Sequence, residues 1–147
     1  MVKVLIKKLK PDVELPSYKT SGASGMDLMA FLEHPIILAP NSSCLVPTGL
    51  SVAFLEDYEI QIRPRSGLAA KSGITVLNTP GTIDSDYRGE IKILLINLGL
   101  NIFKIEHGAR VAQLVIAPIT QANLNVVLTL DATQRGHGGF GSTDQKV

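Results

Sequence analysis

The chain is divided into many short runs of β-branched and other apolar residues, and clusters of turn-forming residues separate these runs. Short apolar runs bounded by Gly, Pro, Asn and Ser are typical of β-strands, and many of them in one chain indicate a sandwich, jelly roll or closed barrel. One run alternates strictly, with Tyr58, Ile60 and Ile62 on one face and charged or amide side chains on the other. We expect strands at residues 2–6, 36–38, 50–54, 58–65, 91–96, 111–116 and 124–128. The sequence therefore predicts an all-β fold.

Turn signals fall between these runs, at residues 40–43, 78–81, 97–101 and 106–108. The segment Asn78–Gly81 lies between two β-branched runs and predicts the tip of a β-hairpin. One short helix is expected around residues 67–72, because Gly73 follows it and glycine commonly ends a helix.

The composition limits the partners that the chain can have. At 147 residues it fits a single domain with one core. Its 14 Lys and Arg nearly balance its 13 Asp and Glu, for a formal net charge of +1, and no lysine-rich run concentrates positive charge. A nucleic acid polymer is therefore not an expected partner. Hydrophobic residues form 45% of the chain and the mean hydropathy is +0.23, an excess that an apolar subunit interface would explain.

The cysteine count and the N-terminal segment indicate in which cellular compartment the protein is expected. Cys44 is the single cysteine, so the chain cannot form an internal disulfide, and the separated histidines His34, His107 and His137 provide no zinc-type ligand set. The lysine-containing segment before Pro11 lacks the apolar region of a signal peptide, and no later run is long enough to span a bilayer. We expect a cytoplasmic protein with no membrane contact.

The segment Gly81–Glu90 concentrates reactive side chains in a turn bounded by glycines. It contains the carboxylates of Asp84 and Asp86, the ring of Tyr87 and a following arginine. Carboxylates and an aromatic ring beside accessible main chain suit a ligand site. The alternative is a solvated turn whose charged side chains simply face water.

A second segment, Pro64–Ala69, combines an arginine and a hydroxyl where a strand ends and the short helix begins. Arg65 and Ser66 precede Gly67, so a guanidinium group and a hydroxyl lie beside main-chain amides. Such a combination can bind phosphate through charge-assisted hydrogen bonds. The alternative is that Ser66 only caps the helix and Arg65 is a solvated strand residue.

The third segment is the glycine-rich tail, Arg135–Thr143, which also carries one arginine, two hydroxyls and one aromatic residue, Phe140. Its glycines match the spacing of the dinucleotide-binding fingerprint. Only six residues follow Gly141, however, so the helix and the later acidic residue of that fingerprint are missing. The tail is either a disordered end or a lid, and its arginine and hydroxyls suit a phosphate while Phe140 suits a base.

Taken together, these segments resemble the trimeric deoxyuridine triphosphatase (dUTPase) family, whose five motifs are matched in order. The matching segments are Ser24–Leu28, Pro64–Ala69, Asn78–Glu90, Arg110–Leu114 and Arg135–Thr143. The resemblance extends from about Leu9 to Thr143. It departs mildly at two positions, where Ser24 replaces a frequent alanine and Asp144 a frequent glycine.

The resemblance implies a jelly-roll-like distorted β-barrel with one short helix, formed by residues 1–130. Residues 131–147 would form a flexible glycine-rich C-terminal arm that closes over the site. The family also implies a homotrimer whose active sites are shared. Motif three would come from one subunit, motifs one, two and four from a second, and motif five from a third.

The implied reaction is the hydrolysis of dUTP to dUMP and pyrophosphate with Mg²⁺ bound to the triphosphate, which removes dUTP from the nucleotide pool and supplies dUMP for thymidylate synthesis. Asp84 would activate the attacking water, and Tyr87 would pack beneath the deoxyribose and exclude a 2′-hydroxyl. Asp27 would reach Mg²⁺ through water, or would instead pair with an arginine such as Arg110. The expected substrate-binding residues are Arg65, Ser66, Gly67, Asn78, Gly81, Thr82, Ile83, Tyr87, Gln113, Arg135, Phe140, Gly141, Ser142 and Thr143.

Two other classes of function stay open. The dCTP deaminases share the fold and some motifs, but they need a catalytic glutamate and do not use a glycine-rich tail with a phenylalanine. A non-catalytic regulatory module of the same fold would bind protein partners. Such a module would have no need to keep Asp84, Tyr87, Arg135 and Phe140 together.

Overall fold

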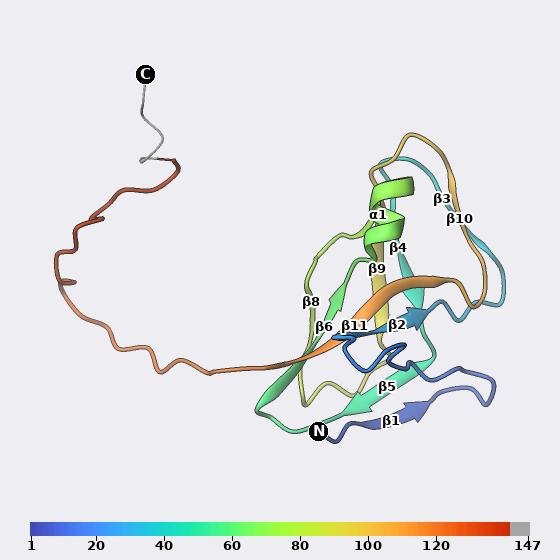
Figure 1. The fold of residues 1–147 in the computed structure, drawn as a ribbon, viewed down its shortest axis with the longest axis horizontal. Helices are drawn as coiled ribbons and strands as arrows, with labels where there is room; N and C mark the ends of the chain where they lie inside the picture. The colour runs from blue at the N-terminus through green and yellow to red at the C-terminus, as the bar shows by residue number, and fades with distance from the viewer. Residues whose placement is uncertain (142–147) are drawn as a thin grey trace.

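The structure is a computed structural model that describes residues 1–141. Its regular secondary structure is β-strand except for one short helix in the described residues (Figure 1). The elements in chain order are β1 (Leu5–Lys8), β2 (Gly25–Met29), β3 (Ile36–Leu38), β4 (Ser43–Pro47), β5 (Leu50–Ala53), β6 (Tyr58–Arg63), α1 (Ser66–Ser72), β7 (Ile74–Val76), β8 (Gly81–Ile83), β9 (Lys92–Asn97), β10 (Phe103–Ile105) and β11 (Arg110–Pro118).

The strands form two larger sheets and two short ribbons. The larger sheets have the orders β2-β11-β6-β8 and β4-β9-β7, and the ribbons pair β1 with β5 and β10 with β3. The paired strands in residues 1–141 all run antiparallel. Most neighbours are far apart in the sequence, so distant segments meet in each sheet, as expected for the predicted all-β architecture.

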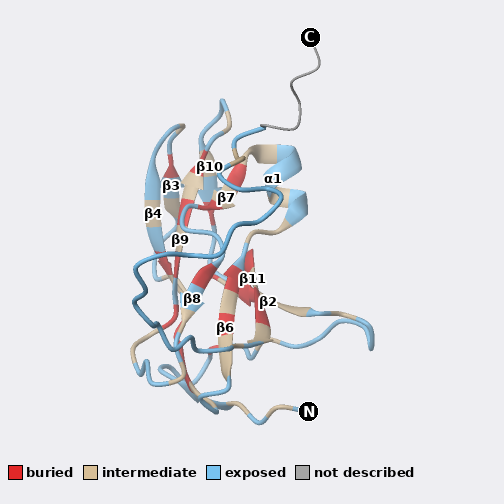
Figure 2. Ribbon diagram, turned by 90° about the vertical axis from the view of Figure 1, so that its left-hand side faces the viewer, coloured by how far each residue is buried: buried red, intermediate tan, exposed pale blue. Residues whose placement is uncertain are grey.

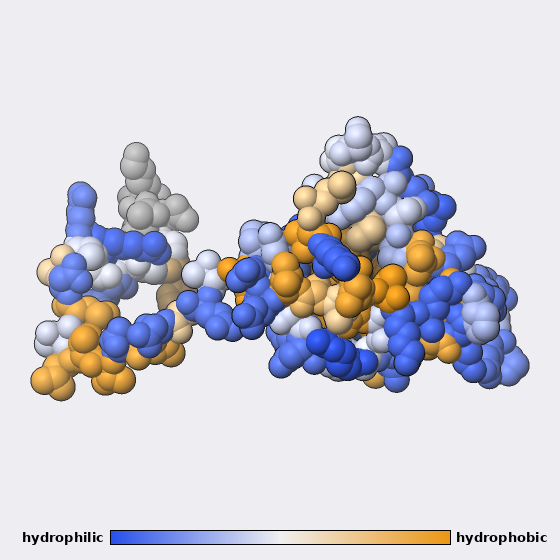
Figure 3. Space-filling view, turned by 90° about the horizontal axis from the view of Figure 1, so that it is seen from below, coloured by the Kyte–Doolittle hydropathy of each residue, from blue (hydrophilic) through white to orange (hydrophobic). Residues whose placement is uncertain are grey.

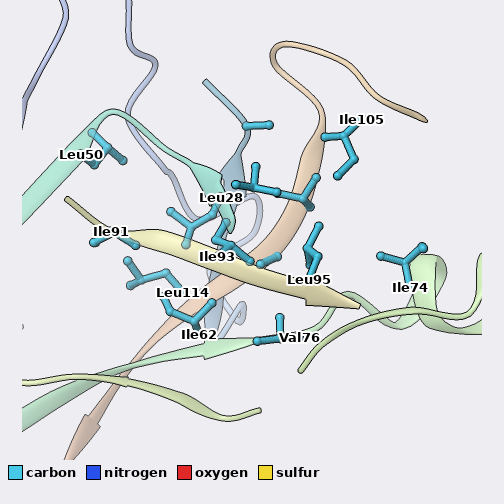
Figure 4. Packing of buried hydrophobic residues seen from close by; sticks show 14 of the residues in the cluster. Leu28, Leu50, Ile62, Ile74, Val76, Ile91, Ile93, Leu95, Ile105 and Leu114 are labelled. Atoms are coloured by element: carbon cyan, nitrogen blue, oxygen red, sulfur yellow. The ribbon is translucent and has the colours of Figure 1, made fainter. Parts of the chain in front are cut away.

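The core lies between these sheets, and β9 shows how the sequence builds it. Ile93 and Leu95 are fully buried, whereas Lys92 is exposed and Leu94 is partly buried, which is the period of two expected for a strand with one face in the core. Figure 4 shows Ile93 and Leu95 beside core residues of neighbouring strands. Burying one such side chain contributes about 1.5–3 kcal/mol. Figure 2 shows that buried residues concentrate in the strands.

The predicted short helix is confirmed as α1, with its C-terminus where the sequence places it. Gly73 adopts φ 67° and its N–H bonds to the carbonyl of Ala69. A side chain at this left-handed position would be strained, and the main chain of Gly99 also approaches too closely to admit one. At the other end Arg65 is the N-cap residue, and no side chain caps the helix. The interpretation of Ser66 as the cap is therefore wrong, because Ser66 is the first helical residue.

The predicted hairpin at Asn78–Gly81 is wrong. The strands on either side of it belong to different sheets, because β7 pairs with β9 and β8 pairs with β6. Turn residues mark where a chain changes direction, but the partner of each strand depends on which distant apolar faces it can cover. The segment instead carries the chain from one sheet to the other.

The strand predicted at residues 124–128 is also wrong. Residues 119–141 contain no helix or strand, and Leu124, Val126 and Leu128 are almost fully exposed. A strand needs a partner for its main-chain hydrogen bonds, and this segment projects away from the body of its own chain (Figure 1). Figure 3 shows apolar surface on the projecting part of the chain. The domain boundary at residue 130 stays a prediction, although the last strand ends at Pro118.

Candidate functional site

A cavity of about 400 Å³ lies between the two larger sheets, at the segment that connects them. This volume is within the range of about 300–1,000 Å³ that is usual for small-molecule sites. Its lining combines apolar side chains from strands with polar side chains from β8 and the turn after it. The lining residues are Leu45, Ile62, Val76, Asn78, Gly81, Thr82, Ile83, Asp84, Tyr87, Glu90, Lys92 and Leu94.

Strand β8 places the predicted motif at this cavity. Gly81 pairs with Ile62 of β6 and is buried, with the side-chain amide of Asn78 close by. A Cβ atom on Gly81 would lie 3.3 Å from Nδ2 of Asn78 and 3.4 Å from Cβ of Ile62. Because glycine leaves this space free, the Asn78 side chain can lie against the main chain of β8.

The turn that follows β8 is held by hydrogen bonds within it. The Tyr87 N–H donates to the Asp84 carbonyl at 3.1 Å, and the Tyr87 hydroxyl donates to the Glu90 carbonyl at 3.1 Å. Arg88 Nη1 donates to the carbonyls of Ser85 and Tyr87 at 2.6 and 3.0 Å. The turn therefore has a defined shape in which Arg88 binds main chain, while the Asp84 and Tyr87 side chains line the cavity.

Glu90 anchors the end of this turn to the body. Its Oε1 accepts a hydrogen bond from the Gly49 N–H at 2.8 Å, and its Oε2 lies 3.9 Å from the Lys92 Nζ. Asp84, in contrast, is exposed and forms no salt bridge within residues 1–141. An exposed carboxylate at the edge of a cavity is available to a water molecule or to a ligand hydroxyl.

A second group of predicted residues meets where β2, β11 and the end of β6 come together. Asp27 pairs across the sheet with Gln113, and its carboxylate receives two arginines. Its Oδ1 lies 3.0 Å from Arg65 Nε, and its Oδ2 lies 3.7 Å from Arg110 Nη1. Arg65 Nη1 also donates to the Arg110 carbonyl at 2.9 Å. The pairing of Asp27 with an arginine such as Arg110 is therefore confirmed, whereas its water-mediated contact with Mg²⁺ stays a prediction.

Gln113 is fixed in the same region. Its Nε2 donates to the Pro64 carbonyl at 2.9 Å, and its Oε1 would lie 2.6 Å from a Cβ atom on Gly25. Glycine at position 25 therefore lets the Gln113 side chain lie across β2. Ser66 and Gly67, at the start of α1, are exposed, and the space beside Gly67 is open.

The tail residues lie apart from both groups. Arg135 Nε donates to the Gly138 carbonyl at 2.9 Å, and the Phe140 side chain is fully exposed. Gly141 ends the described part of the chain, and the predicted residues Ser142 and Thr143 lie outside it. Within one chain the structure thus gathers the motif-three residues at the cavity. The motif-two and motif-four residues lie around Asp27, and neither group is joined to the tail.

Six cavity residues were not among the predicted site residues: Leu45, Ile62, Val76, Glu90, Lys92 and Leu94. The alternation along β9 is a signal for two of them, because Lys92 and Leu94 lie on the face opposite to the core residue Ile93. Leu45 lies opposite Leu94 in the β4–β9 pair, so its position depends on a strand register that no local pattern reveals.

The described residues do not build a direct metal cage. No group of three or more His, Cys, Asp and Glu side chains within residues 1–141 could hold a metal ion. Both oxygens of the Asp27 carboxylate already face arginines. Asp27 therefore does not fit direct coordination of Mg²⁺. In the same part of the chain no helix is long and apolar enough to cross a membrane.

Comparisons with solved structures agree with the fold. The dUTPase of Staphylococcus bacteriophage 80alpha, solved with dUpNHpp, has a TM-score of 0.85 and 25% sequence identity, over 95% of this chain and 97% of its own. A mutant dUTPase from phage phi11 of S. aureus has a TM-score of 0.79 and 20% identity over 88% of this chain and 99% of its own, and its structure concerns the coordination of a structural Mg(II) ion. The predicted jelly-roll-like β fold is confirmed.

Sequence comparisons identify the family. A dUTPase family model matches residues 11–144. A deoxyuridine 5′-triphosphate nucleotidohydrolase of Treponema denticola is 61% identical over 136 residues, which are 92% of this chain and 94% of that protein. The protein of the same name from Brucella melitensis is 56% identical over 133 residues, 89% of this chain and 85% of its own. The chain belongs to the dUTPase family.

Proposed function

We propose that this protein hydrolyses dUTP to dUMP and pyrophosphate. The observation that carries the proposal is the cavity itself, in which an apolar lining meets an amide, an exposed carboxylate and an aromatic ring within one short segment. Its family relatives are named for this hydrolysis. The reaction removes dUTP from the nucleotide pool and supplies dUMP for thymidylate synthesis.

The base is read by Asn78 and the main chain of β8. The Asn78 amide can both donate and accept a hydrogen bond, which matches the mixed edge of uracil. Gly81 lets the main chain come close to that edge, and Thr82 and Ile83 continue the wall of the cavity. A close fit at this wall leaves no room for the methyl group of thymine. The site therefore selects uracil by hydrogen bonding and by shape.

Tyr87 selects the sugar. Its ring lines the cavity and its hydroxyl is bound to the Glu90 carbonyl, so the ring is held as a fixed surface. A deoxyribose packs on this surface, whereas the 2′-hydroxyl of a ribonucleotide collides with it. Rejection by a steric clash is an effective source of specificity.

Asp84 orients the water and accepts its proton. The water oxygen attacks a phosphorus atom of the triphosphate, the phosphoanhydride bond breaks, and the products are dUMP and pyrophosphate. Little covalent chemistry is required of the protein, because positioning and charge neutralisation supply most of the catalysis of phosphoryl transfer. Asp84 suits this role because it is exposed at the cavity and free of salt bridges within residues 1–141.

Arg65, Ser66, Gly67 and Gln113 bind the phosphates, and the tail closes over the substrate. Asp27 holds the Arg65 guanidinium in place through an ion pair. The Ser66 hydroxyl and the adjacent main chain are exposed and accessible to a phosphate. Arg135, Gly141, Ser142 and Thr143 clamp the terminal phosphate, while Phe140 covers the base. A Mg²⁺ ion bound to the triphosphate would supply neutralisation of its negative charge. Asp27, whose two oxygens face arginines, would support the ion only through water.

The active protein is a homotrimer with shared sites. Two features support this proposal: the separation of the predicted residues into three groups within one chain, and the exposure of Leu124, Val126 and Leu128. Another subunit would cover these apolar side chains and receive the tail. The cytoplasmic location expected from the sequence stays a prediction.

Incubation with dUTP or dCTP, followed by separate assays for pyrophosphate and ammonia, distinguishes the alternatives. We expect pyrophosphate from dUTP and no ammonia from dCTP. Ammonia released from dCTP would assign the chain to the deaminases, and the absence of both products would favour a non-catalytic module.

A complementation experiment tests the shared site. Mixed trimers of an Asp84→Asn chain and a chain truncated after Thr133 should recover activity, because some sites then combine an intact aspartate with an intact tail. In the matched control, the Asp84→Asn chain is mixed with a chain that carries both Asp84→Asn and the truncation. No subunit of these trimers offers an intact aspartate. Verified mixed trimers without recovery would show that the tail acts on its own subunit.

A further inference from the structure

Gly89 lies directly against the ring of Tyr87. A Cβ atom built on Gly89 would overlap the hydroxyl oxygen and Cζ of Tyr87, and it would lie 2.9 Å from Cε2 of the same ring. These three atoms are the nearest to that position, and all of them belong to Tyr87. The ring therefore occupies the space that any larger residue at position 89 would need.

The main chain at Gly89 does not itself require glycine. Gly73 and Gly49 have positive φ angles of 67° and 69°, whereas Gly89 is not among the residues with positive φ in the described chain. Alanine can therefore adopt the Gly89 backbone without strain. What excludes a side chain at this position is the seated ring.

If the Tyr87 ring is displaced from this position, it can move into solvent. Tyr87 is 44% exposed, and its hydroxyl is held by one hydrogen bond to the Glu90 carbonyl. The main chain beneath it is less free to move, because Glu90 is anchored to Gly49 and Ile91 N–H bonds to the Leu50 carbonyl. A side chain on residue 89 would thus displace the ring and leave the anchored main chain in place.

We infer that Gly89 is a positioning residue for sugar selection: it gives the Tyr87 ring the seat from which the ring excludes a 2′-hydroxyl. The inference rests on the proposed function for its substrate, but its geometric part concerns Tyr87 alone. Gly89 touches no substrate in this account and acts only through the ring.

Crystal structures of the full-length Gly89→Ala and Gly22→Ala variants test the geometry. Gly22 is a matched control, because its Cβ position has nothing within 4 Å and it too has no positive φ. In Gly89→Ala we expect the Tyr87 hydroxyl to leave the Glu90 carbonyl and to lie beyond hydrogen-bonding distance from it. In Gly22→Ala the ring should stay seated. A ring that keeps its seat in the Gly89→Ala variant would overturn the inference.

Steady-state kinetics with dUTP and UTP test the function. Gly89→Ala should lower the ratio of the two kcat/KM values by at least about 10-fold, the size expected when a steric contact in a specificity site is lost. Gly22→Ala should keep the parental ratio. In a Tyr87→Ala background, adding Gly89→Ala should change the ratio by less than about a factor of two, because the residue acts only through the missing ring.

Failure of the proposed function can be distinguished from failure of the inference about Gly89. If the parent protein does not hydrolyse dUTP, the proposed function is wrong, whereas the crystal structures still decide whether Gly89 seats the ring. If the ring is displaced and the parental ratio persists, the seat plays no part in sugar selection and the inference is refuted. A further large fall in the ratio of the two kcat/KM values when Gly89→Ala is added to Tyr87→Ala would also refute the inference, because the glycine would then act independently of the ring.

Discussion

Asn97 is the buried polar residue that joins the end of β9 to Leu38 in β3 and to the loop between β9 and β10. Its replacement should be severely destabilising. Its side chain is fully buried and makes three hydrogen bonds. Nδ2 donates to the carbonyls of Leu38 and Asn101 at 3.0 and 2.8 Å, and Oδ1 accepts from the Gly99 N–H at 2.9 Å. Asn97→Ala removes all three, and each is worth about 1 kcal/mol, more when a buried partner is left unsatisfied. We expect a loss of about 3–5 kcal/mol.

Thermal unfolding measures this loss. For a chain of this size each kcal/mol shifts Tm by about 2–4 °C, so Asn97→Ala should lower Tm by about 6–20 °C. Asn101→Ala is the matched control, because Asn101 contributes its main-chain carbonyl and should change stability by less than about 0.5 kcal/mol. Both variants must be compared at one protein concentration, since oligomerisation raises apparent stability. A loss below about 1 kcal/mol for Asn97→Ala would show that the three hydrogen bonds contribute little to stability.

Three further predictions concern single side chains. Asp84→Asn should keep substrate affinity in a calorimetric titration but lower kcat by about 10²- to 10⁴-fold, because the amide cannot accept a proton; near-parental turnover would place the base elsewhere. Phe140→Ala should lower kcat/KM for dUTP by about 5- to 150-fold, since base stacking is worth about 1–3 kcal/mol. Phe140→Trp should keep more of the parental kcat/KM than Phe140→Leu does, and equal values for these two variants would argue against stacking. Burial raises the pKa of the Cys44 thiol, so less thiolate forms at about pH 8 and alkylation by iodoacetamide should be slower than in the unfolded chain; equal rates would contradict this.

Local patterns in the sequence predicted the fold where one strand or one turn suffices to define it. The alternation in residues 58–65 places Ile60 and Ile62 in the core, and both are buried in β6. Gly73 ends the helix as predicted. Periodicity could not predict strand partners, because pairing depends on residues far away in the sequence. For this reason the turn residues at Asn78–Gly81 predict a hairpin, although the segment crosses between sheets.

The same limit applies to the site. Asp84, Tyr87 and Asn78 are close together in the sequence, and the structure brings them to one cavity. Leu45 reaches that cavity only because β4 pairs with β9 in one particular register. The apolar run at residues 124–128 predicts a strand. A single chain offers them no partner, so the sequence pattern signals apolar surface correctly and its pairing wrongly.

The selectivity of the proposed dUTP site is measured by the rates of pyrophosphate release from dUTP, dTTP, UTP and dCTP, assayed in parallel with Mg²⁺. We expect kcat/KM for dUTP to exceed that for each other nucleotide by at least about 100-fold, because different residues of one cavity contact the base edge, exclude the thymine methyl group and exclude the 2′-hydroxyl. Comparable values for dUTP and UTP would contradict the role of Tyr87. Comparable values for dUTP and dTTP would contradict the close fit around Asn78 and Gly81, and with it the assignment of this cavity to uracil.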